Sequence, residues 1–388
     1  RNIFFLLFFL LQGRIKMKVT VQKKNLLPVL AKIQGITGRK SNLAITTHVL
    51  LSAETKGFVV SATDLETGFV GSYPAVVEKE GKTVLNSRKL FEIIKDFPSE
   101  DIILQQLDNQ WIEIKKDQIE YHIVGMKPED FPTIPEIKAE VALHLPSRQL
   151  ASMIQKTVII PAAADDRRPH ILGVYLEKLE EGGEILFRMV STDGSRLSKV
   201  DLPIAPAEEA AIERGVLVPK KSLAELGKFL ESEAVAELSF KDNHLLLHRE
   251  DERLIVRLLE GEFPKYHDII KISDGQQVNL DRLTFLSMLR RMSILGSEEY
   301  KGVIFQFEDD TLTVSSTNPD IGESKEVMDI QYRGKKMTTM FNPRFFIDSL
   351  NVMEDEAVVL HLTGEDRPCI LTGEKDRRYL SVLMPMRI

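Results

Sequence analysis

The sequence has one cysteine in 388 residues, and this scarcity excludes two classes of site. Cys369 has no second cysteine with which to form an internal disulfide, and no metal site can be built from several cysteines. A chain without paired cysteines fits a reducing compartment, so we expect it to work in the cytoplasm.

The sequence also lacks a long hydrophobic run. Its longest candidate, Ile3–Leu11, has too few residues for a bilayer, which needs about 20. No small-residue cleavage site follows it, as a secretory signal would require. We interpret residues 1–16 as an N-terminal extension outside the fold, because Met17 opens a plausible strand; a signal or membrane anchor is the alternative interpretation.

Signatures of catalysis and of metal binding are also missing. No GxxxxGK phosphate loop occurs, so the sequence does not predict an ATPase. His244 and His248 lie in a predicted strand, where four residues rise about 13 Å, too far to share one metal ion. We therefore predict no metal site, no cofactor and no catalytic residues.

A threefold repeat organises the rest of the chain. The segments "FVVSATDLETG" (58–68), "FRMVSTDGSRL" (187–197) and "LTVSSTNPDIG" (312–322) are each an apolar run followed by Thr and then Asp or Asn. Such a run entering an Asx-containing segment predicts a strand that ends in a tight turn. Because repeats define domain architecture, we divide the chain into three similar units.

The elements around each turn are repeated too. Every unit reads as a strand, a helix, four strands, a second helix and three strands, with helices predicted in the windows 22–36, 87–97, 147–160, 220–231, 281–295 and 343–353. This pattern predicts an α+β fold of three domains, each with two helices over antiparallel sheet. We place the domains at 17–138, 139–272 and 273–388.

The charge is unevenly distributed. The chain has a formal net charge of -7, yet the six helix windows hold 15 Lys or Arg and 6 Asp or Glu. The basic side chains of a single helix usually only face solvent, but an excess of Lys and Arg over all six helix windows indicates a shared function. Basic side chains without interleaved aromatic residues suit a phosphate backbone rather than bases.

The turn "STDGSRL" (191–197) allows two interpretations. Ser195 beside Asp193 could be the nucleophile of a hydrolase, or the stretch could be a structural turn. No histidine lies nearby in the sequence, and the equivalent turns hold Glu66 and Ile321. We favour the structural turn and keep a hydrolase on a repeated α+β scaffold as the alternative.

From Met17 to Ile388 the chain resembles the bacterial sliding clamps, the beta subunits of the replicative DNA polymerase. The matching motifs run through all three units in order: "MKVTV", "GRKSNLAI", "TDLETG", "RRPHILGVYLE", "STDGSRL", "GEFPKYHDII", "YKGV", "TNPD", "FNPRFFIDSL" and "MPMRI". The extension at residues 1–16 and Ala44, where the family usually has proline, depart from the pattern.

This resemblance implies a non-catalytic processivity factor for DNA replication. It implies a head-to-tail homodimer whose ring encircles duplex DNA without sequence preference, with helices toward the DNA and sheets outside. The implied partners are the replicative polymerase catalytic subunit, the clamp loader ATPase, and repair and translesion polymerases, which dock short peptides in an apolar groove.

The resemblance also implies three sets of site residues. The peptide groove set is Ile171, Thr192, Gly194, Arg196, Leu197, Pro264, Ile269, Val382, Met384, Pro385, Met386 and Arg387, with Arg196 and Arg387 expected near the rim. The DNA-contact set is Arg39, Lys40, Arg148, Arg168, Lys220, Lys221, Arg290 and Arg291. The dimer-interface set is Tyr121 and Ile123 from one subunit with Ile294 and Leu295 from the other.

Overall fold

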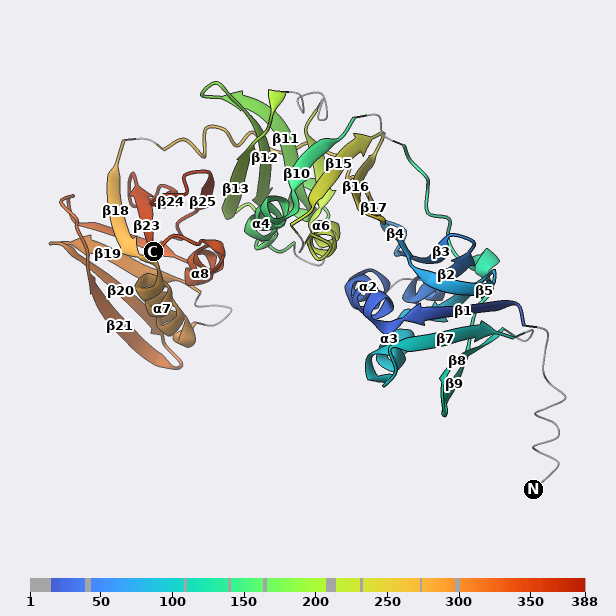
Figure 1. The fold of residues 1–388 in the computed structure, drawn as a ribbon. Helices are drawn as coiled ribbons and strands as arrows, with labels where there is room; N and C mark the ends of the chain where they lie inside the picture. Colours follow the sequence, from blue (N-terminus) through green and yellow to red (C-terminus); the bar gives the residue numbers. More distant parts are fainter. Residues whose placement is uncertain are drawn as a thin grey trace. The chain divides into compact units, whose positions relative to one another are not determined.

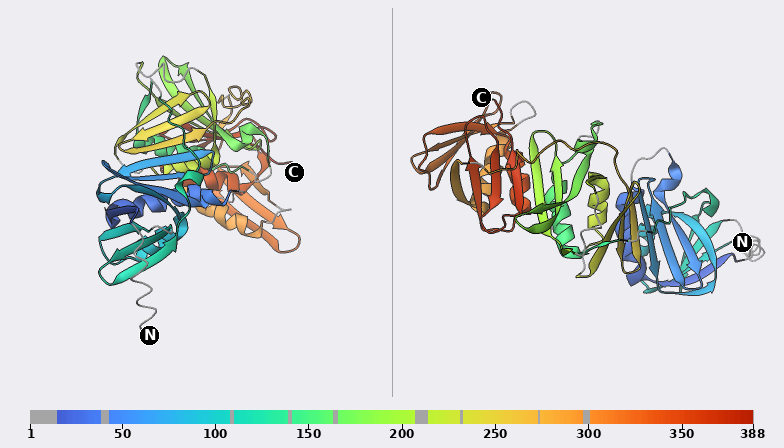
Figure 2. Two further views of the ribbon diagram at one scale, coloured as in Figure 1. Left: turned by 90° about the vertical axis from the view of Figure 1, so that its right-hand side faces the viewer. Right: turned by 90° about the horizontal axis from the view of Figure 1, so that it is seen from above.

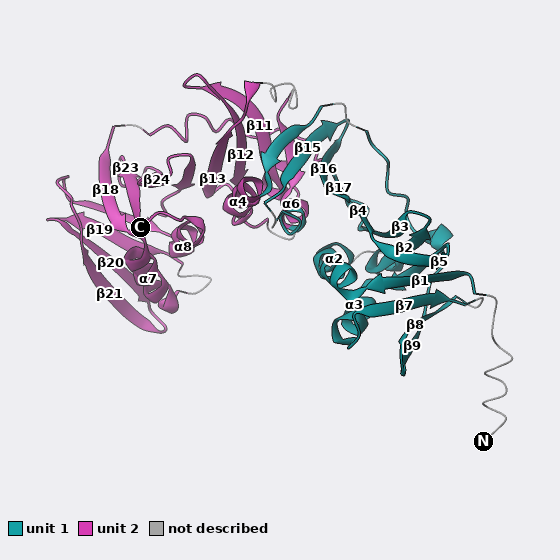
Figure 3. Cartoon of the chain, in the orientation of Figure 1, with its two compact units in different colours: residues 1–147, 225–257 teal, residues 148–224, 258–388 magenta. Residues whose placement is uncertain are grey.

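The computed structural model describes residues 15–38, 43–107, 110–138, 141–162, 166–206, 214–230, 233–272, 274–296 and 301–387. They belong to two compact units (Figure 3). Unit 1 holds residues 1–147 and 225–257, and unit 2 holds residues 148–224 and 258–388. The second predicted domain, 139–272, contributes strands to both units, and the three domain boundaries stay a prediction.

Unit 1 is built from two antiparallel sheets. Its elements are β1 (Met17–Gln22), α2 (Lys23–Thr37), η1 (Ala44–Thr47), β2 (His48–Glu54), β3 (Gly57–Thr63), β4 (Thr67–Tyr73), β5 (Ala75–Lys79), β6 (Gly81–Asn86), α3 (Ser87–Asp96), β7 (Asp101–Gln106), β8 (Trp111–Lys116), β9 (Ile119–Val124), η2 (Pro128–Asp130), β10 (Leu143–Pro146), β15 (Val235–Lys241), β16 (His244–Arg249) and β17 (Glu252–Arg257). The sheets run in the orders β5-β1-β7-β8-β9 and β10-β15-β16-β17-β4-β3-β2-β6.

Unit 2 repeats this plan. Its elements are α4 (Ser147–Val158), α5 (Pro169–Leu172), β11 (Gly173–Glu181), β12 (Glu184–Thr192), β13 (Arg196–Pro203), β14 (Val216–Pro219), α6 (Lys220–Gly227), β18 (Gln276–Asp281), α7 (Arg282–Met292), η4 (Ser293–Leu295), β19 (Val303–Glu308), β20 (Thr311–Asn318), β21 (Gly322–Asp329), β22 (Met337–Phe341), α8 (Pro343–Val352), β23 (Ala357–Leu362), β24 (Cys369–Gly373) and β25 (Tyr379–Leu383). The sheets run β14-β11-β12-β13-β25-β24-β23-β18 and β21-β20-β19-β22. The division between the units passes through the start of α4 and the end of α6.

Each eight-stranded sheet joins strands from two successive repeats (Figures 1 and 2). In unit 1, β4 pairs antiparallel with β17, so that Gly68 lies opposite Ile255. In unit 2, β13 pairs with β25 in the same way, and Leu197 lies opposite Val382. These pairings satisfy backbone groups that would otherwise form open sheet edges.

All six predicted helix windows contain a helix. Asn86, Asp281 and Asn342 accept hydrogen bonds from backbone N–H groups at the starts of α3, α7 and α8, as N-cap side chains do. Helix α6 ends at Gly227, whereas we expected it to reach residue 231. The first repeat also has one strand more than predicted: after Pro74, β5 crosses to pair with β1.

Strand β24 begins at Cys369, whose thiol is fully buried. Burial raises the pKa of this thiol, so that little of the reactive thiolate forms at neutral pH. Among the described residues, no helix is both long and apolar enough to cross a membrane.

Candidate partner groove, basic surface and sheet edges

The turn between β12 and β13 is a closed hydrogen-bonded structure. The Asp193 carboxylate accepts from the backbone N–H groups of Ser195 and Arg196, at 2.9 and 3.0 Å, and from the Arg196 guanidinium. Gly194 has φ +89°, a conformation that favours glycine. With its oxygens committed in this way, Asp193 orients no base for Ser195, and the geometry supports the structural interpretation of the turn.

Arg196 differs from its expected place at the rim of the groove. Its exposed fraction is 6%, and its guanidinium lies between Asp193 and Asp348, the latter at 2.7 Å. It also stacks over the Phe345 ring, 4.4 Å from the ring centroid. The prediction that Arg196 lies at the rim is therefore wrong. Its guanidinium instead links the turn to α8 through Asp348 and Phe345.

The apolar members of the predicted groove set are of two kinds, buried side chains, which we call the floor, and exposed side chains, which we call the wall. Leu197, Val382 and Ile171 are buried, and the first two pack in one cluster with Val190, Tyr266, Ile370 and Leu380. Met384 and Met386 are 40% and 37% exposed, and Pro264, Ile269 and Arg387 are exposed as well. Leu197 and Val382 lie opposite each other on paired strands of one sheet, whereas the flexible methionines can adapt to a ligand.

The C-terminal segment is held in place, as expected. Met384 donates its backbone N–H to Ser195 O at 3.0 Å, and Met386 donates to Met340 O at 2.7 Å. These two bonds fix the segment between the turn and β22. Without them the methionines would fray away from the floor.

Sequence reasoning missed several residues that border this groove. A hollow beside Ile269 is lined by Ile272, Arg367, Pro368 and Ile370. Ile370 also belongs to the cluster under Leu197, so the hollow and the groove share part of one floor. Ile370 lies in β24, all of whose residues are buried, but nothing in the sequence shows that the segment around Ile269 packs beside it.

The predicted DNA-contact residues are of four kinds. Arg39 and Lys40 lie outside the described residues. Arg148 and Lys221 are exposed. The remaining exposed members contact polar partners: Arg168 pairs with Asp166, Arg290 donates to Asn351, and Arg291 pairs with Glu326.

Lys220 is the exception, because its exposed fraction is only 4%. Its ammonium donates to Thr192 O at 3.0 Å, beneath the groove turn. A buried ammonium offers no surface to a phosphate, so the structure contradicts the assignment of Lys220 to DNA contact. Sequence reasoning placed it by its position at the start of a basic helix, which does not show which way a side chain points.

Lys220 should give the protein a distinctive response to pH. Burial lowers the pKa of its ammonium to about 8. Between pH 8 and about 10 the unfolded chain keeps a proton that the native state has lost, so the free energy of unfolding rises with pH. Relative to Lys220→Met, the native protein should gain up to about 1.4 kcal/mol per pH unit in this window. Urea unfolding at pH 7.5, 8.5 and 9.5 measures this slope; Lys221→Met is the exposed control, and equal slopes in wild type and Lys220→Met would contradict the assignment.

The predicted interface residues lie at two sheet edges. Strand β9 pairs only with β8, and β21 pairs only with β20, so each leaves one backbone edge unpaired within the described residues. Tyr121 on β9 is exposed, and Ile294 in η4 is 73% exposed. Ile123 and Leu295 are half-buried. Exposed apolar side chains beside an unpaired strand are typical of a surface that pairs with another chain.

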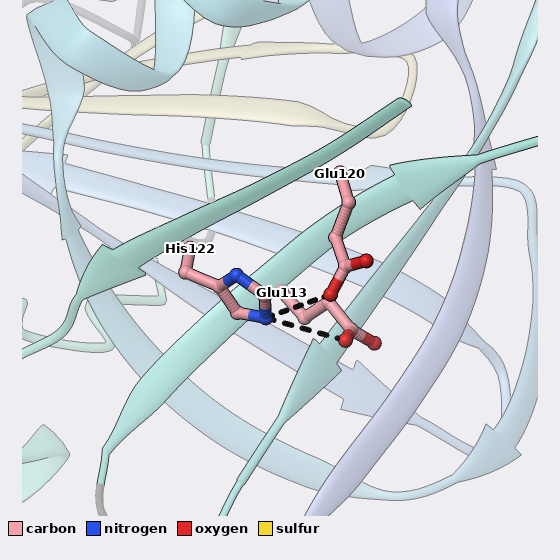
Figure 4. Close-up of side chains that lie close together, drawn as sticks. All are labelled: Glu113, Glu120 and His122. Atoms are coloured by element: carbon pink, nitrogen blue, oxygen red, sulfur yellow. Dashed lines mark ion pairs between the residues drawn. The ribbon is translucent and has the colours of Figure 1, made fainter. Parts of the chain in front are cut away.

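A cluster of ionisable side chains lies on β8 and β9 (Figure 4). His122 Nε2 is 2.9 Å from Glu120 Oε1 and 3.4 Å from Glu113 Oε1. The contact with Glu113 raises the pKa of Glu120, because two neighbouring carboxylates resist double ionisation. Lys115 also pairs with Glu113, so a cation already balances part of this charge, and we interpret the cluster as an ion-pair network.

Comparison with known proteins accounts for nearly the whole chain. Family models of the DNA polymerase III beta subunit match in order: the N-terminal domain at 17–135, the central domain at 144–265 and the C-terminal domain at 272–387. The beta sliding clamp of Chlamydia pneumoniae is 27% identical over 372 residues, covering 96% of this chain and 99% of its own, and that of Pseudomonas putida is 28% identical over 376 residues, covering 96% and 100%. The solved sliding clamp from Bartonella birtlesii shares the fold, with a TM-score of 0.90 at 22% identity over 96% of this chain and 100% of its own.

Proposed function

Because this chain belongs to the family of DNA polymerase III beta subunits, the bacterial sliding clamps, we propose that two copies close head to tail around duplex DNA and tether the replicative polymerase to it. The observation that carries the proposal is the match of all three family domains in order from residue 17 to 387. As a sliding clamp the protein is a processivity factor of DNA replication and not an enzyme. The hydrolase alternative is not favoured, since the Asp193 carboxylate is committed to its own turn.

We assign DNA contact to the exposed basic side chains of Arg148, Arg168, Lys221, Arg290 and Arg291. Arg39 and Lys40 stay in the proposal on the family resemblance alone. Arg168 and Arg291 each share their charge with a carboxylate, so the field at the DNA is weaker than the count of basic residues suggests. Binding that relies on such contacts is independent of sequence and falls steeply with salt.

The groove around Leu197, Val382 and Met384 suits short linear peptides. Its floor is apolar and buried, and its exposed methionines can adapt to different side chains. We propose that the polymerase catalytic subunit, the clamp loader ATPase, and repair and translesion polymerases use this groove in turn. Competition among them would follow from a shared site. The unpaired, buried Cys369 supports a cytoplasmic setting.

Topological retention on DNA tests the ring directly. Protein loaded onto nicked circular DNA should stay bound through gel filtration in about 0.5 M salt, at which phosphate contacts alone are largely lost. Cutting the circle with a restriction enzyme should release it, because a ring slides off a free end. Equal retention on circular and linear DNA, or release from both, would contradict an encircling clamp.

A further inference from the structure

The hydrogen-bond pattern of the groove turn occurs a second time, in unit 1, at the turn between β3 and β4. In unit 1, Leu65 N donates to Thr63 Oγ1, Glu66 N and Thr67 N donate to Asp64 Oδ1, and Arg257 N donates to Glu66 O. In the groove turn, Gly194 N donates to Thr192 Oγ1, Ser195 N and Arg196 N donate to Asp193 Oδ1, and Met384 N donates to Ser195 O. The strand pairing matches too, since Gly68 opposite Ile255 repeats Leu197 opposite Val382. The scaffold of the groove is therefore present twice.

This second scaffold encloses a hollow that lies wholly within unit 1. Its apolar lining is provided by Leu65, Pro132, Ile134, Pro135 and Ile255. Polar side chains complete the lining: Thr63, Glu66, Thr133, Asn243, His244 and Arg257. Pro132 follows Phe131 just as Pro264, a member of the predicted groove set, follows Phe263. A hollow that combines prolines and aliphatic side chains with a few polar groups has the character of a ligand-binding surface.

Leu65 takes the position that Gly194 has in the groove turn. Its φ is +78°, a left-handed conformation that is strained for leucine, and its side chain is 52% exposed. Burial within unit 1 therefore offers little compensation for the strain. Strained residues of this kind gather at sites that contact ligands.

Arg257 takes the position of Met384. The residue is exposed, and among the described residues its side chain has no carboxylate partner, while its backbone N–H donates to Glu66 O. At this position the groove presents the thioether of Met384 to a ligand, whereas the hollow presents the positive charge of Arg257. A carboxylate is the group that a guanidinium binds best, through two parallel hydrogen bonds.

We propose that this hollow is a second docking site, which takes an extended partner peptide with an aliphatic side chain against Leu65 and Pro135 and an acidic residue on Arg257. The two sites then differ in ligand chemistry: the groove selects apolar side chains, and the hollow selects an apolar side chain beside a carboxylate. The proposal rests on the geometry of unit 1 and holds whether or not peptides dock at the groove.

Disulfide tethering tests the proposal with defined probes. Thr133→Cys places an exposed thiol in the lining, and the buried Cys369 does not compete for thiol exchange. The probes are the peptides acetyl-Cys-Gly-Leu-Glu-Leu-amide and the same peptide with Gln in place of Glu, at equilibrium with mercaptoethanol. We expect about tenfold stronger capture of the Glu peptide, measured by intact mass, because only its carboxylate can bridge to the guanidinium.

Three further variants separate docking from a structural role. Adding Arg257→Gln should make capture of the two peptides equal, and adding Met384→Ala at the groove should change neither. Adding Leu65→Gly should weaken capture of both peptides without lowering the melting temperature, since glycine relieves the strained backbone. Equal capture of the Glu and Gln peptides before any change at Arg257 would overturn the proposal. So would concentration-dependent self-association that Leu65→Gly abolishes, because the hollow would then be an interface between copies.

Discussion

Removing residues 384–388 should abolish peptide binding at the groove while leaving the dimer intact. The deletion takes away the exposed wall formed by Met384 and Met386, and with it the backbone bonds to Ser195 and Met340 that hold the wall over the floor. A few buried anchors dominate the energy of such sites, so we expect binding to weaken at least about 100-fold. Fluorescence anisotropy of a labelled peptide with a glutamine followed by Leu and Phe measures the loss.

The double variant Met384→Ala with Met386→Ala is the conservative form of this experiment, because it keeps the backbone bonds. It should lose about tenfold or more in affinity, whereas Leu283→Ala, an exposed leucine on α7 outside the groove, should lose nothing. Sedimentation should show the same dimer for all of these variants. Full-strength binding by the truncated protein would place the groove elsewhere.

Replacing Ile294 and Leu295 together by alanine should convert the dimer into monomers. Ile294 is 73% exposed in the single chain, so its truncation costs the folded protomer little. In the proposed ring the same side chain is buried against the partner, where losing it costs about 2 kcal/mol or more. A closed dimer has two identical seams, so each substitution counts twice and the total loss shifts the dimer equilibrium by several orders of magnitude.

Sedimentation velocity and native mass spectrometry at nanomolar concentration measure this change. Val76→Ala is the matched control, because Val76 is an exposed aliphatic residue on β5, the opposite edge of the sheet that contains β9. Monomers that still bind the labelled peptide would show that the seam and the groove are separate. A double variant that remains dimeric at nanomolar concentration would contradict the proposed seam.

The sequence alone was sufficient for the repeated order of strands and helices, because that order depends on local patterns. Alternation predicts a strand, a one-sided apolar period predicts a helix, and Asp64, Asp193 and Asn318 each follow a strand threonine with a side chain suited to a tight turn. Recognition of the family also needed only sequence, since its motifs run through all three repeats. The extra strand β5 was missed because its pairing with β1 joins residues about 60 positions apart, beyond the reach of local periodicity.

Only the tertiary structure decided which side chains remain available at each site. Lys220 and Lys221 are adjacent basic residues, yet one is buried beneath Thr192 and the other is exposed. Arg196 was predicted at a rim and lies buried between two carboxylates, because α8 brings Asp348 to it from 152 positions away. The joining of β4 to β17 and of β13 to β25 likewise creates both the groove and the hollow from distant segments. Local patterns determine what a segment becomes, but burial, pKa and pairing depend on which segments meet, and that depends on the packing of the whole chain.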